Sequence, residues 1–266
     1  MCLRLSVAAC FMAAAVSGDP SNAPTPAKPT GTIQGRTIFA GDPDNYLPVP
    51  FPRDDRYVFC AALPRPILTE HVVVNRETHP ITLRNVVVWI HTGFDANKSP
   101  FPTQPVILEQ RDCRFVPRVV ALRAGQSLRV VNGDPTLLNV NFLPRVNDEI
   151  SYNIPKQGAS RDFTFVSERP FPVKQMVHPW MIAWVAVFNH PFFAVSGEDG
   201  TFKLQKVPPG KYTLEAWHET FGILQSEADL GPGETKTVDF TFDPKPEKPE
   251  TPVEFPRVFD DSPRKR

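Results

Sequence analysis

His178 and Met181 lie three positions apart, and Met176 precedes His178 by two. Imidazole nitrogen and thioether sulfur are donors that soft metal ions such as cuprous copper accept. The sequence therefore leaves open a small soft-metal site in this stretch. The remaining histidines do not pair at the spacing of zinc ligands, so no zinc site is predicted; they are His71, His79, His91, His190 and His218.

Acid–base chemistry has one further candidate. His218 and Glu219 are adjacent, but no nucleophile accompanies them, and a turn at the end of a strand is the favoured interpretation. The paired carboxylates of Pro52–Arg56 are typical of a solvated loop. No nucleophile elbow, phosphate-binding loop or dinucleotide fingerprint occurs in the sequence. We therefore predict that the protein is not an enzyme.

The first residues have the order of an export signal. Arg4 is followed by the uncharged run Leu5–Val16 and then by small residues, which predicts a signal peptide at residues 1–18 and a secreted or periplasmic protein. The run is shorter than a bilayer span, so no transmembrane segment is expected in the mature chain. A buried N-terminal element is one alternative, and lipoprotein anchoring at Cys10 is another.

Two cysteines, Cys60 and Cys113, remain after such an export step. Exported proteins meet an oxidising compartment, in which paired thiols form disulfides. We therefore predict a Cys60–Cys113 disulfide. The alternative is a pair of unrelated buried thiols.

Proline makes up 31 of the 266 residues, more than double the roughly 5% of ordinary proteins. Helix interiors reject proline, so this content favours short strands and loops. The 29 basic and 29 acidic residues balance, which leaves no electrostatic footprint for nucleic acid or an anionic membrane surface. The richest stretches predict an extended spacer at residues 19–30 and a disordered, charged tail at residues 243–266.

Between these stretches, short apolar runs separated by turn signals predict strands and no convincing helix. Strands at this spacing indicate an all-β protein made of sandwich modules. The predicted strands are Thr32–Phe39, Asn85–Ile90, Val106–Gln110, Val119–Leu122, Ser127–Val131, Leu138–Phe142, Asp162–Val166, Trp180–Phe188, Thr201–Leu204, Lys211–Trp217 and Thr237–Phe242.

The segment Glu198–Trp217, EDGTFKLQKVPPGKYTLEAW, has a DG turn before one strand and a PPGxY turn before the next. It resembles the carboxypeptidase regulatory-like, transthyretin-like β-sandwiches, which share a fold with starch-binding-like modules. The earlier strands of that family resemble Gly31–Ile33 and Asn85–Val88, which lie more than 100 residues upstream of the DG turn. The resemblance implies a sandwich built from distant parts of the chain.

The intervening segment Glu109–Phe142, EQRDCRFVPRVVALRAGQSLRVVNGDPTLLNVNF, follows the course of a cupredoxin. The chain resembles secreted bacterial plastocyanin-like proteins that join such a domain to a regulatory-like sandwich. This resemblance would place the copper ligands, two imidazoles, a thiolate and an axial thioether, on Leu138, His178, Gln175 and Met181. Because Leu138 and Gln175 replace a histidine and the cysteine, it implies a degenerate site without bound copper, in which Leu138 packs beside Met181.

For the domain arrangement we predict a discontinuous regulatory-like sandwich, residues 31–93 and 192–242, interrupted by a cupredoxin-like domain at residues 94–191. An insertion of this length is tolerable because the cost of closing a loop grows slowly with its length. Two consecutive domains with a boundary near Pro191 are the alternative. Pairing of Val86–Ile90 with strands after Glu198 would distinguish the two arrangements.

The leading functional interpretation is a non-catalytic binding or structural module of the cell envelope, with an envelope protein or a glycan as its partner. A carbohydrate-binding module is the alternative, and it requires an exposed, coplanar platform that includes Trp180, Trp184 or Trp217. A copper-dependent electron carrier is a third interpretation. It is opposed by Leu138 and Gln175.

Overall fold

The computed structural model describes residues 28–51, 53–94 and 100–244. The predicted signal peptide, Cys10 and most of the two predicted proline-rich stretches lie outside the described residues. Helical structure within these ranges is limited to the 3-10 turn η2 (Pro43–Tyr46) and the single turn α1 (Val58–Ala61), so the predicted all-β class is confirmed. No helix in these ranges is long and apolar enough to cross a membrane.

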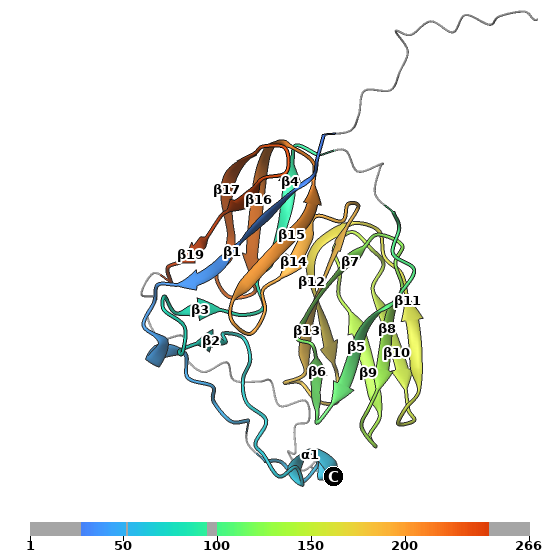
Figure 1. Ribbon diagram of the computed structural model, residues 1–266. Helices are drawn as coiled ribbons and strands as arrows, with labels where there is room; N and C mark the ends of the chain where they lie inside the picture. The colour runs from blue at the N-terminus through green and yellow to red at the C-terminus, as the bar shows by residue number, and fades with distance from the viewer. Residues whose placement is uncertain (1–27, 52, 95–99, 245–266) are drawn as a thin grey trace, which may run out of the picture.

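The strands form two sandwiches that lie side by side (Figure 1). The first, the split sandwich, contains β1 (Gly31–Phe39), β2 (Val74–Asn75), β3 (Thr82–Leu83), β4 (Val87–Thr92), β14 (Phe193–Val195), β15 (Thr201–Val207), β16 (Gly210–His218), β17 (Gly222–Leu230), β18 (Thr235–Thr237) and β19 (Phe240–Phe242). The second, the inserted sandwich, contains β5 (Val106–Arg111), β6 (Arg114–Val116), β7 (Val119–Arg123), β8 (Leu128–Asn132), β9 (Leu138–Phe142), β10 (Ile150–Ile154), β11 (Ser160–Phe163), β12 (Glu168–Gln175) and β13 (Ile182–Phe188).

Strands from distant parts of the chain share each sheet of the split sandwich. One sheet has the order β15-β1-β3-β2, with β18 and β19 also paired to β1, and the other has the order β14-β4-β16-β17. The β4–β16 pairing places Trp89 opposite Glu215 and Val88 opposite Ala216. This is the pairing that an interrupted sandwich requires.

The burial pattern and the pairing of strand β1 show how its sequence suits this sheet. Its residues alternate between buried and half-buried along the whole strand. One edge of β1 pairs antiparallel with β15, and the other pairs parallel with β18 and then β19. A side chain at Gly35 would place its Cβ only 1.8 Å from the carbonyl oxygen of Val238, so the crossing between β18 and β19 needs glycine there.

The inserted sandwich packs the sheet β10-β9-β12-β13-β7 on the sheet β11-β8-β5-β6. Strand β12 carries Pro170 and Pro172, residues that a central strand rarely accommodates. Both precede the part of β12 that pairs with β9, which begins at Val173, and the β12–β13 register is irregular between Glu168 and Phe171. The prolines are therefore tolerated where the sheet is locally incomplete.

A third apolar cluster joins the two sandwiches. It contains residues of the split sandwich, such as Val87 and Trp89 on β4, and residues of the inserted one, such as Val119 on β7 and Ala186 and Phe188 on β13. Each of these side chains is buried. The two sandwiches consequently share a hydrophobic contact rather than only a linker.

Candidate functional site

Two loops meet at one end of the inserted sandwich. Strands β9 and β12 are antiparallel, with Val140 opposite Gln175, so the first residue of β9 and the last of β12 lie at the same end. The loop after β12 carries His178 and returns to β13 past Met181. The fold thus brings together Leu138, Gln175, His178 and Met181, the four positions that the cupredoxin resemblance singled out.

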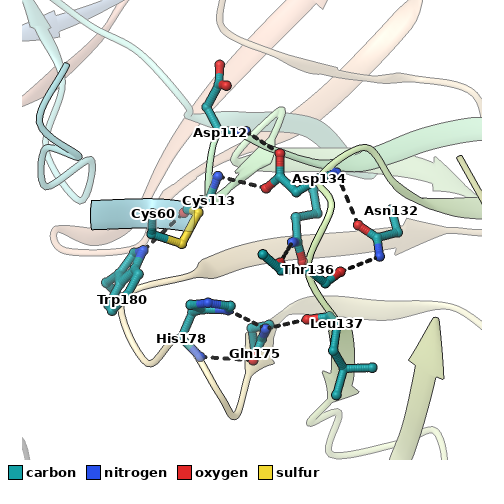
Figure 2. The surroundings of a disulfide bond; sticks show 11 residues. Cys60, Asp112, Cys113, Asn132, Asp134, Thr136, Leu137, Gln175, His178 and Trp180 are labelled. Atoms are coloured by element: carbon teal, nitrogen blue, oxygen red, sulfur yellow. Dashed lines mark hydrogen bonds between the residues drawn. A yellow bond between two sulfur atoms is a disulfide. The ribbon is translucent and has the colours of Figure 1, made fainter. Parts of the chain in front are cut away.

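The side-chain amide of Gln175 is the centre of this end (Figure 2). Its oxygen accepts hydrogen bonds from the backbone N–H groups of His178, at 3.0 Å, and Val177. Its nitrogen lies 3.2 Å from the carbonyl oxygen of Leu137 and 2.6 Å from Nδ1 of His178. Gln175 is 1% exposed, and these four contacts use both hydrogens of its amide nitrogen and both acceptor positions of its oxygen.

These contacts determine the state of His178. Because backbone N–H groups only donate, the oxygen of Gln175 must face them and the amide nitrogen must face the imidazole. Nδ1 of His178 is therefore the acceptor, and the proton of the neutral ring lies on Nε2. Burial lowers the pKa of His178 below its ordinary value, and the carboxylate of Asp134 opposes this shift only in part.

The four positions do not fit copper. Leu138 has no donor atom and is fully buried in the same apolar core as Met181. Gln175 offers a neutral amide where the pattern needs a thiolate, and that amide engages the Nδ1 lone pair of His178. Met176, which the sequence left open as a soft-metal ligand, is 68% exposed, whereas Met181 is buried. Within the described residues, no group of three or more His, Cys, Asp and Glu side chains could hold a metal ion.

A polar network beside Gln175 positions Cys113. Asn132 donates from its amide to the carbonyl oxygens of Thr136 and Ile154, and its own oxygen accepts from the N–H of Asp134. The buried carboxylate of Asp134 then accepts from the N–H groups of Asp112 and Cys113, each at 2.8 Å.

Asp112 and Cys113 form the two-residue turn between β5 and β6, and both have positive φ, 52° and 57°. Neither is glycine, so the turn adopts a backbone conformation that these residues disfavour. The carboxylate of Asp134 compensates by binding the two N–H groups that this turn directs toward it. The N-G-D sequence at residues 132–134 thus stabilises the turn that carries Cys113.

The Cys60–Cys113 disulfide is present, as predicted. It attaches a hairpin of the split sandwich to the end of the inserted one. We call this hairpin, residues 49–51 and 53–71, the covering segment. Its two arms pair through a bridge between Pro50 and Leu68 and through hydrogen bonds on either side, and its tip carries α1 with Cys60.

The covering segment lies over His178 and Trp180. The ring centroid of Tyr57 is 5.1 Å from that of His178 and 5.0 Å from that of Trp180, and Phe51 contacts Trp180 at 6.0 Å. The indole N–H of Trp180 donates to the carbonyl oxygen of Cys113 at 3.0 Å. His178 is consequently 3% exposed although it lies in a loop.

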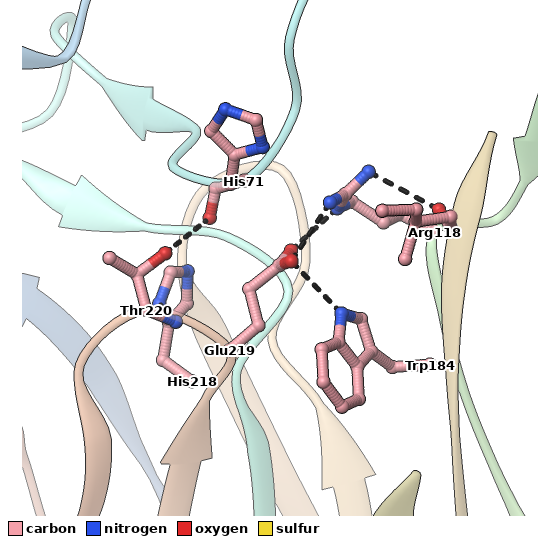
Figure 3. Close-up of polar contacts among 7 residues, drawn as sticks. His71, Arg118, Trp184, His218, Glu219 and Thr220 are labelled. Atoms are coloured by element: carbon pink, nitrogen blue, oxygen red, sulfur yellow. Dashed lines mark hydrogen bonds and ion pairs between the residues drawn. The ribbon is translucent and has the colours of Figure 1, made fainter. Parts of the chain in front are cut away.

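A buried ion pair between Arg118 and Glu219 joins the two sandwiches (Figure 3). Nε of Arg118 lies 2.5 Å from one carboxylate oxygen of Glu219, and a second guanidinium nitrogen lies 2.8 Å from the other. The indole N–H of Trp184 donates to the same carboxylate at 2.9 Å. The two charged side chains are only 7% and 9% exposed. Glu219 is thus committed to a structural contact, and the sequence contained no sign of its partner.

His218, the neighbour of Glu219, is buried and takes no part in the ion pair. Its ring stacks on Phe221 at 4.9 Å, and its Nδ1 accepts from the N–H of Thr220. Burial, assisted by the positive charge of Arg118, lowers the pKa of His218 to about 3. An imidazole with this pKa stays neutral at ordinary pH. Strand β16 ends at His218 and a turn follows at Glu219, as the sequence predicted.

The three tryptophans considered for a glycan platform do not share a plane. Trp184 and Trp217 face each other between the sandwiches, with ring centroids 4.9 Å apart and planes at 62°. Trp180 lies under the covering segment instead. All three are half-buried. This arrangement differs from the exposed, coplanar surface that the carbohydrate-binding interpretation requires.

No family model and no curated protein sequence matches this chain. Among solved structures, it is similar to amicyanin from Paracoccus versutus, with 20% identity and a TM-score of 0.29 over 38% of this chain and 96% of that chain. It is also similar to a purple cupredoxin from Nitrosopumilus maritimus, with 17% identity and a TM-score of 0.27 over 31% of this chain and 98% of that chain.

A copper-containing nitrite reductase from Thermus scotoductus is similar as well, with 17% identity and a TM-score of 0.29 over 36% of this chain. The similarity spans only 25% of the reductase chain. What these comparisons establish is a likeness to cupredoxin-type chains that extends over little more than a third of this protein.

Proposed function

We propose that this chain is a non-catalytic, extracytoplasmic protein in which a cupredoxin-type sandwich serves as a structural or binding module. Its partner on this proposal is another envelope protein or a glycan. The disulfide is consistent with an oxidising compartment.

The observation that carries the proposal is the amide of Gln175. In the cupredoxin pattern this position supplies the thiolate, and the thiolate gives the copper its electron-transfer properties. Here the amide is hydrogen-bonded to the Nδ1 atom that a metal would need, at 2.6 Å. Because the amide of Gln175 takes the place of the thiolate and binds His178, this end of the sandwich is better suited to be a rigid core than a redox centre.

The contact between the sandwiches supports the architectural part of the proposal. A shared apolar cluster and the Arg118–Glu219 ion pair hold the two modules together. A protein built to present two modules in one orientation needs such a contact, because modules joined only by linkers move independently.

Copper titration of the purified, oxidised protein tests the proposal. We expect no visible thiolate-to-copper absorption band and no stoichiometric retention of copper after desalting. The double variant Leu138→His/Gln175→Cys is the matched control, since it restores the two donors while keeping His178 and Met181. A coloured, stoichiometric copper complex of the unaltered protein would overturn the proposal, whatever the variant does.

A further inference from the structure

The covering segment is held to the protein by unusually little burial. Among its described residues, Cys60 is the only buried one. The rest are half-buried or exposed, and Val58 beside the disulfide is 77% exposed. A segment with so few buried apolar contacts has low local stability of its own.

Open space beneath and beside the covering segment also indicates that its local stability is low. The stretch Leu63 to Leu68, with Asp112 and Arg114, lines an open crevice of about 570 Å³. Two smaller open pockets, of about 20 and 40 Å³, lie between the segment and Trp180. Close packing of the segment over its whole length would fill this space. The disulfide is therefore the strongest attachment of the tip.

The covering segment shields the imidazole of His178, which becomes accessible to solvent if the segment moves away. His178 carries its proton on Nε2 because Gln175 binds Nδ1, and the ring is shielded by Tyr57 and Trp180. Tyr57 belongs to the covering segment, whereas His178 and Trp180 belong to the inserted sandwich. Displacing the segment would open the imidazole and the indole face together.

The disulfide has an access route for a thiolate. Cys113 is fully buried, but Cys60 is 7% exposed and lines the small open pocket of about 20 Å³, together with Arg53, Asp54 and Arg65. The two guanidinium groups outnumber the single carboxylate, which favours the approach of an anionic sulfur. Attack is consequently directed to the sulfur of Cys60, with Cys113 as the leaving thiolate.

We propose that the Cys60–Cys113 disulfide is a redox catch, and that a dithiol reductant releases the covering segment and exposes the end of the inserted sandwich around His178. One thiolate of the dithiol attacks Sγ of Cys60, a mixed disulfide forms, and Cys113 leaves as a thiolate that takes up a proton. The second thiol of the dithiol then attacks the mixed disulfide and frees Cys60. Two electrons pass to the cystine, two cysteine thiols result, and the dithiol becomes a disulfide. The inference goes beyond the proposed function, because it does not depend on whether copper binds.

Hydroxyl-radical labelling, which oxidises accessible imidazole rings whichever nitrogen carries the proton, tests this catch on the full chain. The oxidised protein is compared with protein reduced by dithiothreitol and alkylated with iodoacetamide, and each histidine is followed by peptide mass spectrometry. We expect labelling of His178 to rise roughly tenfold or more on reduction. His218, which is 1% exposed and contacts Phe221 and Phe242 within the split sandwich, should remain protected.

Two results would overturn the catch. In one, both cysteines are alkylated but His178 stays protected, which would mean that the aromatic contacts hold the segment without the disulfide. In the other, His178 and His218 become labelled together, which would mean that reduction unfolds the whole protein. The oxidised Tyr57→Ala variant keeps the disulfide and removes the ring over His178, so it should give a rise smaller than reduction does.

Discussion

The inserted sandwich is attached to the rest of the chain in two places, and the two attachments differ in kind. At the contact with the split sandwich, attachment is by burial: an apolar cluster and an ion pair that is 7% and 9% exposed. At the covering segment it is by a covalent bond and a few ring contacts, with Cys60 as the sole buried residue of that described segment. The first attachment resists reductants and depends on charge, whereas the second depends on the oxidation state of two sulfur atoms.

Removing one charge of the buried pair should have the largest effect. Arg118→Met keeps the apolar stem but leaves the carboxylate of Glu219 buried without its cation, and we expect a loss of about 3–5 kcal/mol in the free energy of unfolding. Urea denaturation measures it. Arg129→Met is the matched control, because the Arg129–Asp162 pair has a similar distance, 2.7 Å, but is 44% exposed on both sides. Its loss should be far smaller.

Equal losses in these two variants would contradict the view that burial makes the contact between the sandwiches. The double variant Arg118→Met/Glu219→Gln adds a second check. It should be more stable than Arg118→Met alone, since it removes the unpaired charge as well.

Reduction of the disulfide should have the next largest effect. The bond joins residues 53 positions apart, and closing a loop of that length stabilises a protein by about 2–4 kcal/mol. Denaturation with and without dithiothreitol measures the loss. Because the two attachments share no residue, the losses from reduction and from Arg118→Met should add to within about 0.5 kcal/mol. Strong non-additivity would show that they act as one unit.

Acid should weaken the split sandwich through His218, whose ring packs on Phe221 and Phe242. Its pKa is about 3 in the folded protein against an ordinary 6.5, so the unfolded chain binds the proton first. Stability is fully present above pH 6.5 and falls as the pH drops from 6.5 towards 3. This single group should cost about 1.4 kcal/mol between pH 7.5 and pH 5.5.

The variant His218→Phe, which keeps a ring against Phe221, should lose less stability over that pH interval than the unaltered protein. His79→Gln is the control, because it removes an exposed imidazole rather than a buried one. Identical pH profiles for the unaltered protein and His218→Phe would show that this histidine does not carry the acid sensitivity. His190, whose pKa burial lowers to about 4, would then be the next group to replace.

Local patterns predicted much of the fold. The strand Leu138–Phe142 has the same bounds in the sequence interpretation and in the structure. Strand β12 was missed because Pro170 and Pro172 speak against a strand, and only the local sheet irregularity makes them acceptable. Strand β17 was missed because its side chains are mostly polar and exposed at the edge of a sheet, where no apolar alternation is needed.

The sequence predicted only those site residues that lie close together in the chain or that match the cupredoxin resemblance. Gln175, His178 and Met181 lie within seven residues, and the resemblance connected them to Leu138. The hydrogen bond between Gln175 and His178 could not be anticipated, because it depends on amide orientation in a buried loop. Arg118 and Glu219 are 101 positions apart, and neither lies in a motif. Contacts between modules of this kind depend on docking geometry, which single-sequence patterns do not contain.

The position of β1 has a consequence for the order in which the protein can fold. This strand needs β15 on one edge and β18 and β19 on the other, so it has to wait until residue 242 has been synthesised. The inserted sandwich, complete at residue 188, can fold earlier. During that interval β1 has only β3 as a native pairing partner, at Ile38, and its other unpaired edges are prone to aggregate. We therefore expect that any need for a chaperone during synthesis arises from the split sandwich. Its first strand, β1, is the segment that has to be protected, although it is the first strand to be made.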